Sequence, residues 1–368
     1  MRWAIYILAL IIASCTSTPK SQNPIVNTCY TPQYATGFEI GYDSEGRKVL
    51  WITDPCQGLS HFEQGLYLLT PEQSAPKGAN AIVAPASKLS VLSSSHAAML
   101  DAIGMAEAVV GASGVRYYTN NTIRTCATEI GYDTALDYER IKAIGTQVML
   151  LYSVYGVDNT AMNKLSQLGI PYIYIGDYAE PTPLGKAEWI VAIAALCGRE
   201  QEAIEIFNGI AERYNALKAS AANYTVRPKV MLNTPYRDSW FMPAVESYAV
   251  QLIADAGAEY IYSQNKSHQS IPISLEQALL LASAADVWIN VGNIASLAQL
   301  KSENPRFATI PAVTSGRVYN NTKRTNNAGG SDFWESGALN ADIVLDDMIK
   351  LLHHNAPTDS LHYYKRLE

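Results

Sequence analysis

The sequence lacks the features that define several large classes of protein. Only 17% of its 368 residues are charged, and no low-complexity tract interrupts the chain, which excludes a disordered or fibrous protein. Basic residues are not in excess. The formal net charge is -7, whereas nucleic-acid binding requires a basic surface that faces the phosphates. We therefore expect a globular protein without a nucleic-acid partner, and its length predicts two packed lobes.

The motifs of common hydrolases and nucleotide-binding enzymes are also missing. The chain has no Gly-x-Ser-x-Gly turn, no phosphate-binding loop that ends in Lys-Ser or Lys-Thr, and no His-Glu-x-x-His helix. Cys126 and Cys197 have no obvious histidine partner. We therefore predict a protein that is not an enzyme and carries no cofactor. An envelope hydrolase that uses Ser95 and His96 is the weakest alternative.

One apolar run, at the N-terminus, indicates export. Arg2 precedes the apolar residues 3–13, which are too few to span a bilayer comfortably, and small residues lead to Cys15. The pattern resembles a lipobox, in which the cysteine is diacylated and becomes the first residue of the mature protein. An ordinary secretory signal is the alternative. We expect lipidation of Cys15, because two acyl chains anchor a protein stably.

The residues after Cys15 predict a tether at the membrane. Residues 16–27 are rich in Ser, Thr, Asn and Pro, which is typical of a flexible segment. No acidic residue follows Cys15 closely, and we take this to favour an anchor that faces the periplasm of a cell envelope. Four further cysteines remain, an even number that permits disulfides without specifying their pairing: Cys29, Cys56, Cys126 and Cys197.

Beyond the tether, short apolar strands alternate with helical segments, which predicts an α/β fold with mostly parallel sheets. The predicted strands are 88–93, 107–112, 147–152, 171–175, 229–233, 286–291 and 317–320. A long helical stretch with a break at Gly198 separates two such sets, so we expect two Rossmann-like lobes joined by a rigid helix. The predicted divisions are a lipoprotein signal (1–15), a tether (16–30), an N-terminal β-hairpin extension (31–84), an N-terminal lobe (85–183), linking helices (184–225), a C-terminal lobe (226–355) and a C-terminal tail (356–368).

An ordered set of short motifs carries a resemblance to a known family. The motifs are Lys88–His96, Gly111–Tyr117, Leu168–Pro171, Pro183–Trp189 and Gly330–Glu335, together with two similar helix starts at 136–141 and 273–278. Between residues 85 and 353 the chain resembles class III periplasmic binding proteins, the family that serves importers of cobalamin, ferric siderophores and haem. The last two long motifs resemble a lipoprotein subgroup common in Bacteroidota.

The resemblance implies a function and a set of partners. It implies an extracytoplasmic receptor that binds a metal chelate between its lobes and delivers it to an ABC permease with its ATPase. The chelate would be a ferric siderophore, a corrinoid or haem, and we expect a monomer. Glu139 and Glu276 match the positions at which this family presents one exposed glutamate per lobe to the permease. Their alternative role is a favourable interaction with the dipole of their own helix, since Asp137 and Ser274 are predicted N-caps.

Ligands of open α/β sheets bind beyond the carboxyl ends of the strands, so the loops after the strands are the candidate site. Many of these loops contain tyrosine or tryptophan, whose flat faces suit a large planar ligand. Four arginines in or near the loops, at 116, 237, 306 and 324, could pair with anionic groups of a chelate. The predicted ligand-binding residues are Ser94, Ser95, His96, Tyr117, Tyr152, Tyr155, Glu180, Trp240, Phe241, Arg324, Asp332 and Trp334.

A receptor for free zinc or manganese ions is the main alternative function. His96, Glu180, His268 and Asp332 all fall in loops that could converge on a metal ion. The related ion receptors typically offer three histidines and one carboxylate, whereas only His96 and His268 qualify as histidine ligands here. We therefore predict no metal site.

Overall fold

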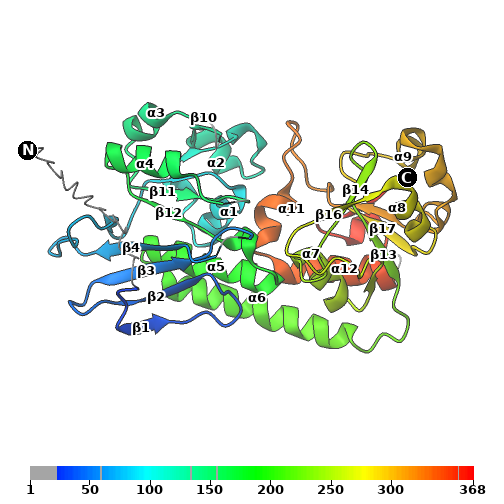
Figure 1. The fold of residues 1–368 in the computed structure, drawn as a ribbon, viewed down its shortest axis with the longest axis horizontal. Helices are drawn as coiled ribbons and strands as arrows, with labels where there is room; N and C mark the ends of the chain where they lie inside the picture. The colour runs from blue at the N-terminus through cyan, green and yellow to red at the C-terminus, as the bar shows by residue number, and fades with distance from the viewer. Residues whose placement is uncertain (1–22, 59, 133–134, 155, 355) are drawn as a thin grey trace, which may run out of the picture.

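The computed structural model describes residues 23–58, 60–132, 135–154, 156–354 and 356–368. The predicted signal peptide, Cys15 and Tyr155 lie outside the described residues. Figure 1 shows two α/β lobes side by side, with one long helix, α6, running beneath both. The prediction of two lobes with mostly parallel sheets joined by a long helix is confirmed. Within the described part of the chain, no helix is both long and apolar enough to cross a bilayer.

The N-terminal extension is a five-stranded sheet and not only a hairpin. Its order is β1-β2-β3-β4-β5, antiparallel except for the parallel pair β4 and β5. The predicted turn at Asp43–Gly46 joins β2 to β3, and the Asp43 carboxylate accepts hydrogen bonds from two backbone N–H groups of the turn. The strands are β1 (Asn27–Tyr30), β2 (Phe38–Tyr42), β3 (Lys48–Thr53), β4 (Glu63–Leu69) and β5 (Ala81–Val83). Because residues 27–30 pair with β2, the predicted tether cannot extend to residue 30.

The N-terminal lobe is built on a fully parallel sheet of order β12-β11-β6-β7-β8. The central strands β6 and β11 are buried along their whole length, as expected when helices cover both faces of a parallel sheet. Its strands are β6 (Leu89–Val91), β7 (Val109–Ala112), β8 (Thr128–Glu129), β11 (Val148–Leu151) and β12 (Tyr172–Tyr174), with a small hairpin of β9 (Gly131–Tyr132) and β10 (Ala135–Leu136). Its helices are α1 (Ser94–Ala102), α2 (Asn121–Cys126), α3 (Tyr138–Ala143) and α4 (Asn159–Leu168).

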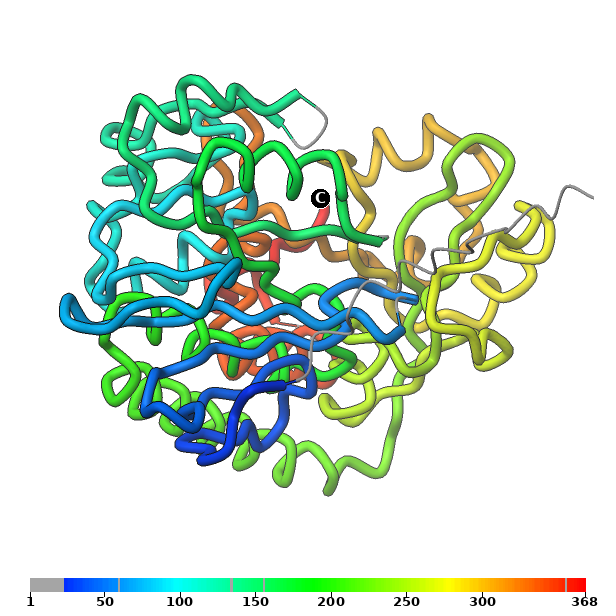
Figure 2. The backbone as a smooth tube through the Cα atoms, turned by 60° about the vertical axis from the view of Figure 1, so that its left-hand side comes forward, coloured from blue at the N-terminus to red at the C-terminus, as the bar shows by residue number. Residues whose placement is uncertain are grey.

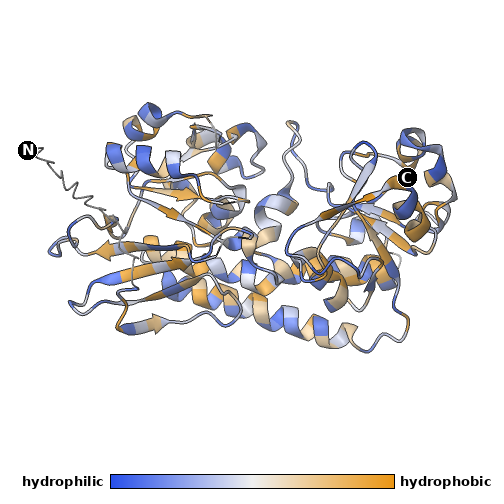
Figure 3. Ribbon diagram, viewed as in Figure 1, coloured by the Kyte–Doolittle hydropathy of each residue, from blue (hydrophilic) through white to orange (hydrophobic). Residues whose placement is uncertain are grey.

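Two helices follow, with the predicted break at Gly198 between them. Helix α5 (Pro183–Leu196) begins at the N-cap Thr182 and is buried on nearly every side, because β2, α1 and α6 all pack on it. Helix α6 (Glu200–Ala221) is amphipathic and also packs on α12 of the C-terminal lobe. Figure 3 shows the corresponding contrast between apolar strands and a mixed polar and apolar α6.

The C-terminal lobe repeats the pattern with a sheet of order β15-β13-β17-β18-β19. Its strands are β13 (Lys229–Leu232), β15 (Glu259–Tyr260), β17 (Val287–Ile289), β18 (Val318–Asn320) and β19 (Lys365–Arg366), and β14 (Ser239–Met242) and β16 (Ile271–Ser274) form a separate antiparallel ribbon. Its helices are α7 (Tyr248–Asp255), α8 (Leu275–Ala282), α9 (Leu297–Glu303), α10 (Pro311–Thr314), α11 (Asp332–Glu335) and α12 (Ala341–His353).

The last residues, which we predicted as a C-terminal tail (356–368), pack on this lobe. Strand β19 pairs antiparallel with β18, and Tyr363 and Tyr364 are buried. The carboxylate of Asp347 on α12 accepts hydrogen bonds from the backbone N–H groups of residues 362, 363 and 364. A buried carboxylate is stable there because several donors satisfy it.

A buried carboxylate also attaches the N-terminal sheet to the rest of the protein. The carboxylate of Glu188, fully buried on α5, accepts hydrogen bonds from the Tyr30 hydroxyl and from the backbone N–H groups of residues 33, 34 and 35, at 2.7–2.8 Å. Glu180 accepts from the Thr36 N–H and the Trp189 indole N–H. The extension is therefore part of the folded body (Figure 2).

Candidate functional site

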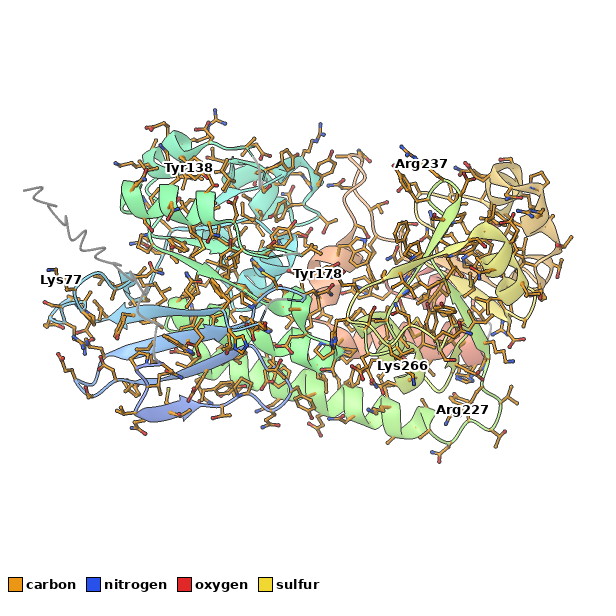
Figure 4. The ribbon with its side chains drawn as sticks, viewed as in Figure 1. Lys77, Tyr138, Tyr178, Arg227, Arg237 and Lys266 are labelled. Atoms are coloured by element: carbon orange, nitrogen blue, oxygen red, sulfur yellow. The ribbon has the colours of Figure 1, made fainter. Side chains whose placement is uncertain are left out.

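A cavity of about 1350 Å³ lies between the two lobes. Its walls include the residues that directly follow β6, β7, β11 and β12 of the first sheet and β13, β17 and β18 of the second. This is the position expected for a ligand site in open α/β sheets. Tyr178, labelled in Figure 4, lies between the lobes and lines this cavity.

The N-terminal sheet provides a third wall, which we did not predict. Thr36, Gly37 and the segment after β3, including Asp54, Gln57 and Gly58, line the cavity. A Cβ atom built on Gly58 would lie 3.4 Å from the Gln269 Nε2 of the C-terminal lobe, so this segment reaches across to the opposite lobe. The local sequence does not predict such a contact, because the contact depends on how the N-terminal sheet packs on α5.

The start of α1 carries a buried polar network centred on Asp177. The Ser95 hydroxyl donates to Asp177 Oδ2 at 2.9 Å, and His96 Nε2 lies 3.2 Å from Asp177 Oδ1. The Lys186 ammonium lies 3.5 Å from the same carboxylate. Burial by itself raises the pKa of Asp177, but the charge of Lys186 and the hydrogen bonds from His96 and Ser95 outweigh it and hold the pKa well below its ordinary value.

This network changes the roles predicted for Ser95 and His96. Ser94 and Ser95 line the cavity, whereas His96 is fully buried behind them and does not line it. The prediction of direct ligand binding by His96 is therefore wrong in this structure. Ser95 and His96 both face Asp177 instead of forming a nucleophile and base pair, which gives no support to a hydrolase. Asp177 and Lys186 were missed, although Lys186 lies in a motif that carried the family resemblance.

Aromatic side chains form much of the surface around the cavity. Tyr117, Tyr152 and Trp334, all predicted, line it together with Tyr132 and Tyr178. Trp334 is 61% exposed, which is unusual for a tryptophan; its ring packs edge-to-face on that of Phe333 at 4.8 Å and leaves much of its surface open to a ligand. Flat, exposed rings on both lobes suit a large ligand with apolar or planar surfaces.

Trp240 and Phe241 do not contribute to this surface. Trp240 is fully buried, its indole N–H donates to the Leu232 carbonyl, and its ring lies 5.4 Å from that of Trp288. Phe241 is exposed, but it is not among the residues that line the cavity. No residue of β14 lines the cavity. The prediction for Trp240 is wrong because its ring has no exposed surface, and the cavity wall includes no part of Phe241.

The carboxylate of Glu180, a predicted ligand residue, is mostly engaged in hydrogen bonds within the protein. It lines the cavity but is buried, and its carboxylate accepts from the backbone of Thr36 and Gly37 and from Trp189. Burial raises the pKa of Glu180, and these hydrogen bonds oppose the increase.

The loop that ends in α11 connects the two lobes. Arg324 and Asp332, both predicted ligand residues, form an ion pair with each other at 2.5 Å and do not line the cavity. Glu335 accepts hydrogen bonds from the backbone N–H groups of Thr119 and Asn120 in the other lobe. The Asn326 amide donates across the same boundary to the carbonyls of residues 116 and 118. These contacts join the two lobes.

The two predicted docking glutamates occupy equivalent places. Asp137 caps α3 and Ser274 caps α8, as predicted, so that Glu139 and Glu276 lie in the first turns of these helices. Both are exposed, and α3 and α8 belong to different lobes (Figure 1). Glu276 forms an exposed ion pair with Arg306 at 3.4 Å.

Metal ligands do not gather in the described structure. In residues 23–368, apart from the positions left undescribed, no group of three or more His, Cys, Asp or Glu side chains could hold a metal ion. The four cysteines within this part of the chain, at 29, 56, 126 and 197, are free thiols, so no disulfide joins them.

Comparisons with known proteins agree with this geometry. A family model described as a periplasmic binding protein matches residues 89–325. An uncharacterized lipoprotein of Methanocaldococcus jannaschii is 29% identical over 287 residues, which cover 74% of this chain and 66% of that protein. The match thus spans slightly less than two thirds of this relative's length.

Solved structures of low sequence identity share the fold. A periplasmic haem-binding protein of Roseiflexus sp. RS-1 has a TM-score of 0.58 at 17% identity and covers 73% of this chain and 98% of its own. A periplasmic vitamin B12 binding protein of Vibrio cholerae has a TM-score of 0.56 at 14% identity, with coverages of 73% and 97%. A siderophore-binding protein of Vibrio cholerae, solved with Fe³⁺-Desferal, has a TM-score of 0.54 at 18% identity, with coverages of 72% and 99%.

Proposed function

The chain belongs to the periplasmic binding protein family, and from that membership we propose that it is the receptor of an ABC importer for a metal chelate. It is a solute-binding protein and not an enzyme. The chelate, a ferric siderophore, a corrinoid or haem, binds between the lobes and passes unchanged to the permease and its ATPase. Structural neighbours named for haem, vitamin B12 and a siderophore support this range of ligands.

The cavity is the observation that carries the proposal. At about 1350 Å³ it exceeds the roughly 300–1,000 Å³ typical of sites for drug-sized ligands. Exposed aromatic rings line it, and hydroxyl and amide groups at the strand ends provide hydrogen bonds. This combination suits a bulky ligand with a large apolar surface and a polar periphery.

The connection between the lobes supports capture with little hinge motion. Helix α6 packs on both α5 and α12, and Glu335 and Asn326 add hydrogen bonds between the lobes. A receptor joined in this way keeps its site largely formed before the ligand arrives.

Transfer to the permease would use Glu139 and Glu276. Each projects from the first turn of a capped helix, one on each lobe, so two carboxylates at separated positions can orient the receptor on a basic partner surface. A lipid at Cys15 would hold the receptor at the membrane, facing the periplasm, and the lipoprotein relative supports this anchor.

Ligand binding can be tested by equilibrium dialysis together with tryptophan fluorescence. We expect one chelate among cobalamin, haem and several ferric siderophores to bind with micromolar affinity or better and to quench emission. Trp334 is the exposed tryptophan at the cavity, so Trp334→Phe should remove most of the quenching while dialysis still detects the ligand. Absence of binding by any of these chelates contradicts the proposal.

Docking has a separate test in transport assays. Replacing both Glu139 and Glu276 with alanine should lower uptake at least about tenfold, because each charge pair at a partner surface contributes about 1 kcal/mol or more. Affinity for the chelate should stay unchanged. A double alanine variant at Glu72 and Glu107, which are exposed glutamates elsewhere, is the matched control. Equal transport by the two double variants would exclude the docking role.

A further inference from the structure

We infer that the cavity selects chelates that carry no net negative charge, an inference that rests on the proposed chelate-binding function. Among the described residues that line the cavity, the charged side chains are five carboxylates and one lysine, and His268 is the histidine. The carboxylates are Asp54, Asp177, Glu180, Glu246 and Glu335. The wall therefore contains an excess of negative charge.

The lysine is not free to receive an anionic ligand. The Lys186 ammonium lies 3.5 Å from Asp177 Oδ2, and its side chain is mostly buried. It also lies 5.3 Å from the centre of the Tyr178 ring and 5.8 Å from that of Tyr248, one ring from each lobe. An anion that approached Lys186 would have to compete with the carboxylate that already neutralises it.

Two of the carboxylates, Glu180 and Glu335, are buried without a cation beside them. Their oxygens accept hydrogen bonds from N–H groups of residues 36, 37 and 189 and of residues 119 and 120, and from hydroxyls, but they form no ion pair in the described structure. Burial raises the pKa of both carboxyls. As carboxylates, both groups repel an anion, and no cation beside them offsets that repulsion.

The remaining two carboxylates leave oxygens that a ligand can approach. Asp54 Oδ1 accepts one hydrogen bond, from the Phe62 N–H, and no ion pair involves Asp54 in the part of the chain that is described. Glu246 is exposed, and the contacts of the described residues include neither an ion pair nor a hydrogen bond for it. Asp54 comes from the N-terminal sheet and Glu246 from the C-terminal lobe, so negative charge faces the cavity from two of its walls.

Four arginines could have reversed this balance. None of Arg116, Arg237, Arg306 and Arg324 lines the cavity. Arg324 pairs with Asp332 and Arg306 with Glu276, while the Arg116 guanidinium donates to the Tyr117 hydroxyl and lies 4.6 Å from the centre of that ring. The rest of the C-terminal wall is neutral and rich in amides: Asn233, Gln269, Asn290, Asn293 and Asn321.

These groups match a particular ligand chemistry. Amides and hydroxyls donate to and accept from neutral polar groups, and unpaired carboxylates favour positive charge. An anionic chelate would lose its hydration beside carboxylates and receive no cation in exchange. The matching ligand is a large chelate that is neutral or cationic and bears amide or hydroxyl groups on its periphery. Haem with ionised carboxylates and ferric tris-catecholates fall outside this class.

A charge series of chelates tests the inference. The probes are cyanocobalamin, a cationic ferric trihydroxamate, haem and an anionic ferric tris-catecholate, each measured by equilibrium dialysis with the full chain at low and moderate salt. We expect cyanocobalamin or the trihydroxamate to bind at least about tenfold more tightly than either anion. If haem or the tris-catecholate binds most tightly, the inference is overturned while the proposed chelate-binding function stands. If no probe binds, both fail.

Charge substitutions at the cavity provide an internal check with the cationic probe. Asp54→Asn and Glu246→Gln keep side-chain shape, and each should weaken binding of the cationic trihydroxamate by roughly 3–10-fold. Arg116→Gln should leave that affinity within about twofold, and so should Glu72→Gln, the matched control far from the cavity. The inference would be overturned if Glu246→Gln bound the cationic trihydroxamate more tightly than the unchanged protein does. It would also be overturned if Arg116→Gln lowered the affinity for the anionic chelates by more than about tenfold.

Discussion

The two lobes share one architecture but present different chemistry to the cavity. The N-terminal lobe lines it with hydroxyls and tyrosine rings, including Ser94, Ser95 and Tyr117, backed by a buried network around Asp177. The C-terminal lobe lines it mainly with amides such as Asn290 and small polar groups, with Trp334 as its exposed ring. The difference lies in the loops after the strands, while the strands themselves supply a common frame.

The lobes also hold the two ends of the folded chain in a similar way. The carboxylates of Glu188 in the N-terminal half and Asp347 in the C-terminal half each accept hydrogen bonds from several backbone N–H groups of a terminal segment. In the N-terminal half that segment leads into a whole sheet that reaches the cavity. The buried carboxylate of Asp347 therefore holds a single terminal strand, whereas that of Glu188 holds a sheet that forms the third wall of the cavity.

The largest effect should come from breaking the attachment of the N-terminal sheet. Glu188→Ala leaves three backbone N–H groups and the Tyr30 hydroxyl without their acceptor, so we expect the free energy of unfolding to fall by about 3–5 kcal/mol. Chemical denaturation monitored by circular dichroism measures this loss of unfolding free energy. Asp347→Ala is the counterpart in the other lobe, and a loss below about 1 kcal/mol in both variants would contradict the assigned role.

A smaller effect should follow from disrupting the polar network around Asp177 in the N-terminal lobe. Asp177→Asn should lower the free energy of unfolding by about 2–3 kcal/mol at neutral pH, because the amide cannot match the charge of Lys186 and accept from both Ser95 and His96.

The pH dependence of that difference is a stricter test. The folded-state pKa of Asp177 lies below its ordinary value of 3.8, so its contribution is fully present above that pH and is lost as the pH falls toward the folded-state pKa. The unfolding free energies of Asp177→Asn and the unchanged protein should therefore converge below about pH 4. A difference that stays constant down to pH 3 would contradict the ionised role of Asp177.

Ligand affinity should separate the two walls. With whichever chelate binds, Tyr117→Ala on the N-terminal wall should weaken affinity about tenfold, because stacked aromatic area is lost. Asn293→Ala on the C-terminal wall should weaken it about threefold to fivefold, the effect of one hydrogen bond. Tyr236→Ala, at an exposed tyrosine that does not line the cavity, is the control. The reverse order of the two effects would show that the amide wall dominates recognition.

The smallest effect concerns the glutamates on the outer surface of the lobes. Glu276→Gln should change the free energy of unfolding by less than about 0.5 kcal/mol, because its ion pair with Arg306 is exposed to solvent. Glu139→Gln should behave alike in thermal or chemical denaturation. A loss above about 1 kcal/mol for either would assign that residue a structural role and weaken the docking proposal.

Much of the frame could be predicted from local sequence. All seven predicted strands are present, at β6, β7, β11, β12, β13, β17 and β18, and the helix break at Gly198 and the caps Asp137 and Ser274 were found as predicted. These features depend on hydrophobic periodicity and capping within a few residues. Short edge strands such as β8, β15 and β19 were missed, because their two-residue pairings leave almost no local pattern.

The candidate site was predicted less completely, for a physical reason. Local sequence identifies which residues follow a strand, and Ser94, Ser95, Tyr117, Tyr152 and Trp334 do line the cavity. It does not reveal which of them packing will bury. His96 and Trp240 have no exposed surface.

By itself, the amino-acid sequence determined the order of strands and helices, the division into two lobes and the membership of a binding-protein family, since apolar periodicity and short motifs are local properties. Only the tertiary structure decided that the N-terminal sheet forms a third wall, that Asp177 engages Ser95, His96 and Lys186, and that the arginines lie outside the cavity. These are contacts between residues far apart in the chain, and the charge of the cavity depends on which of those side chains packing brings to its surface.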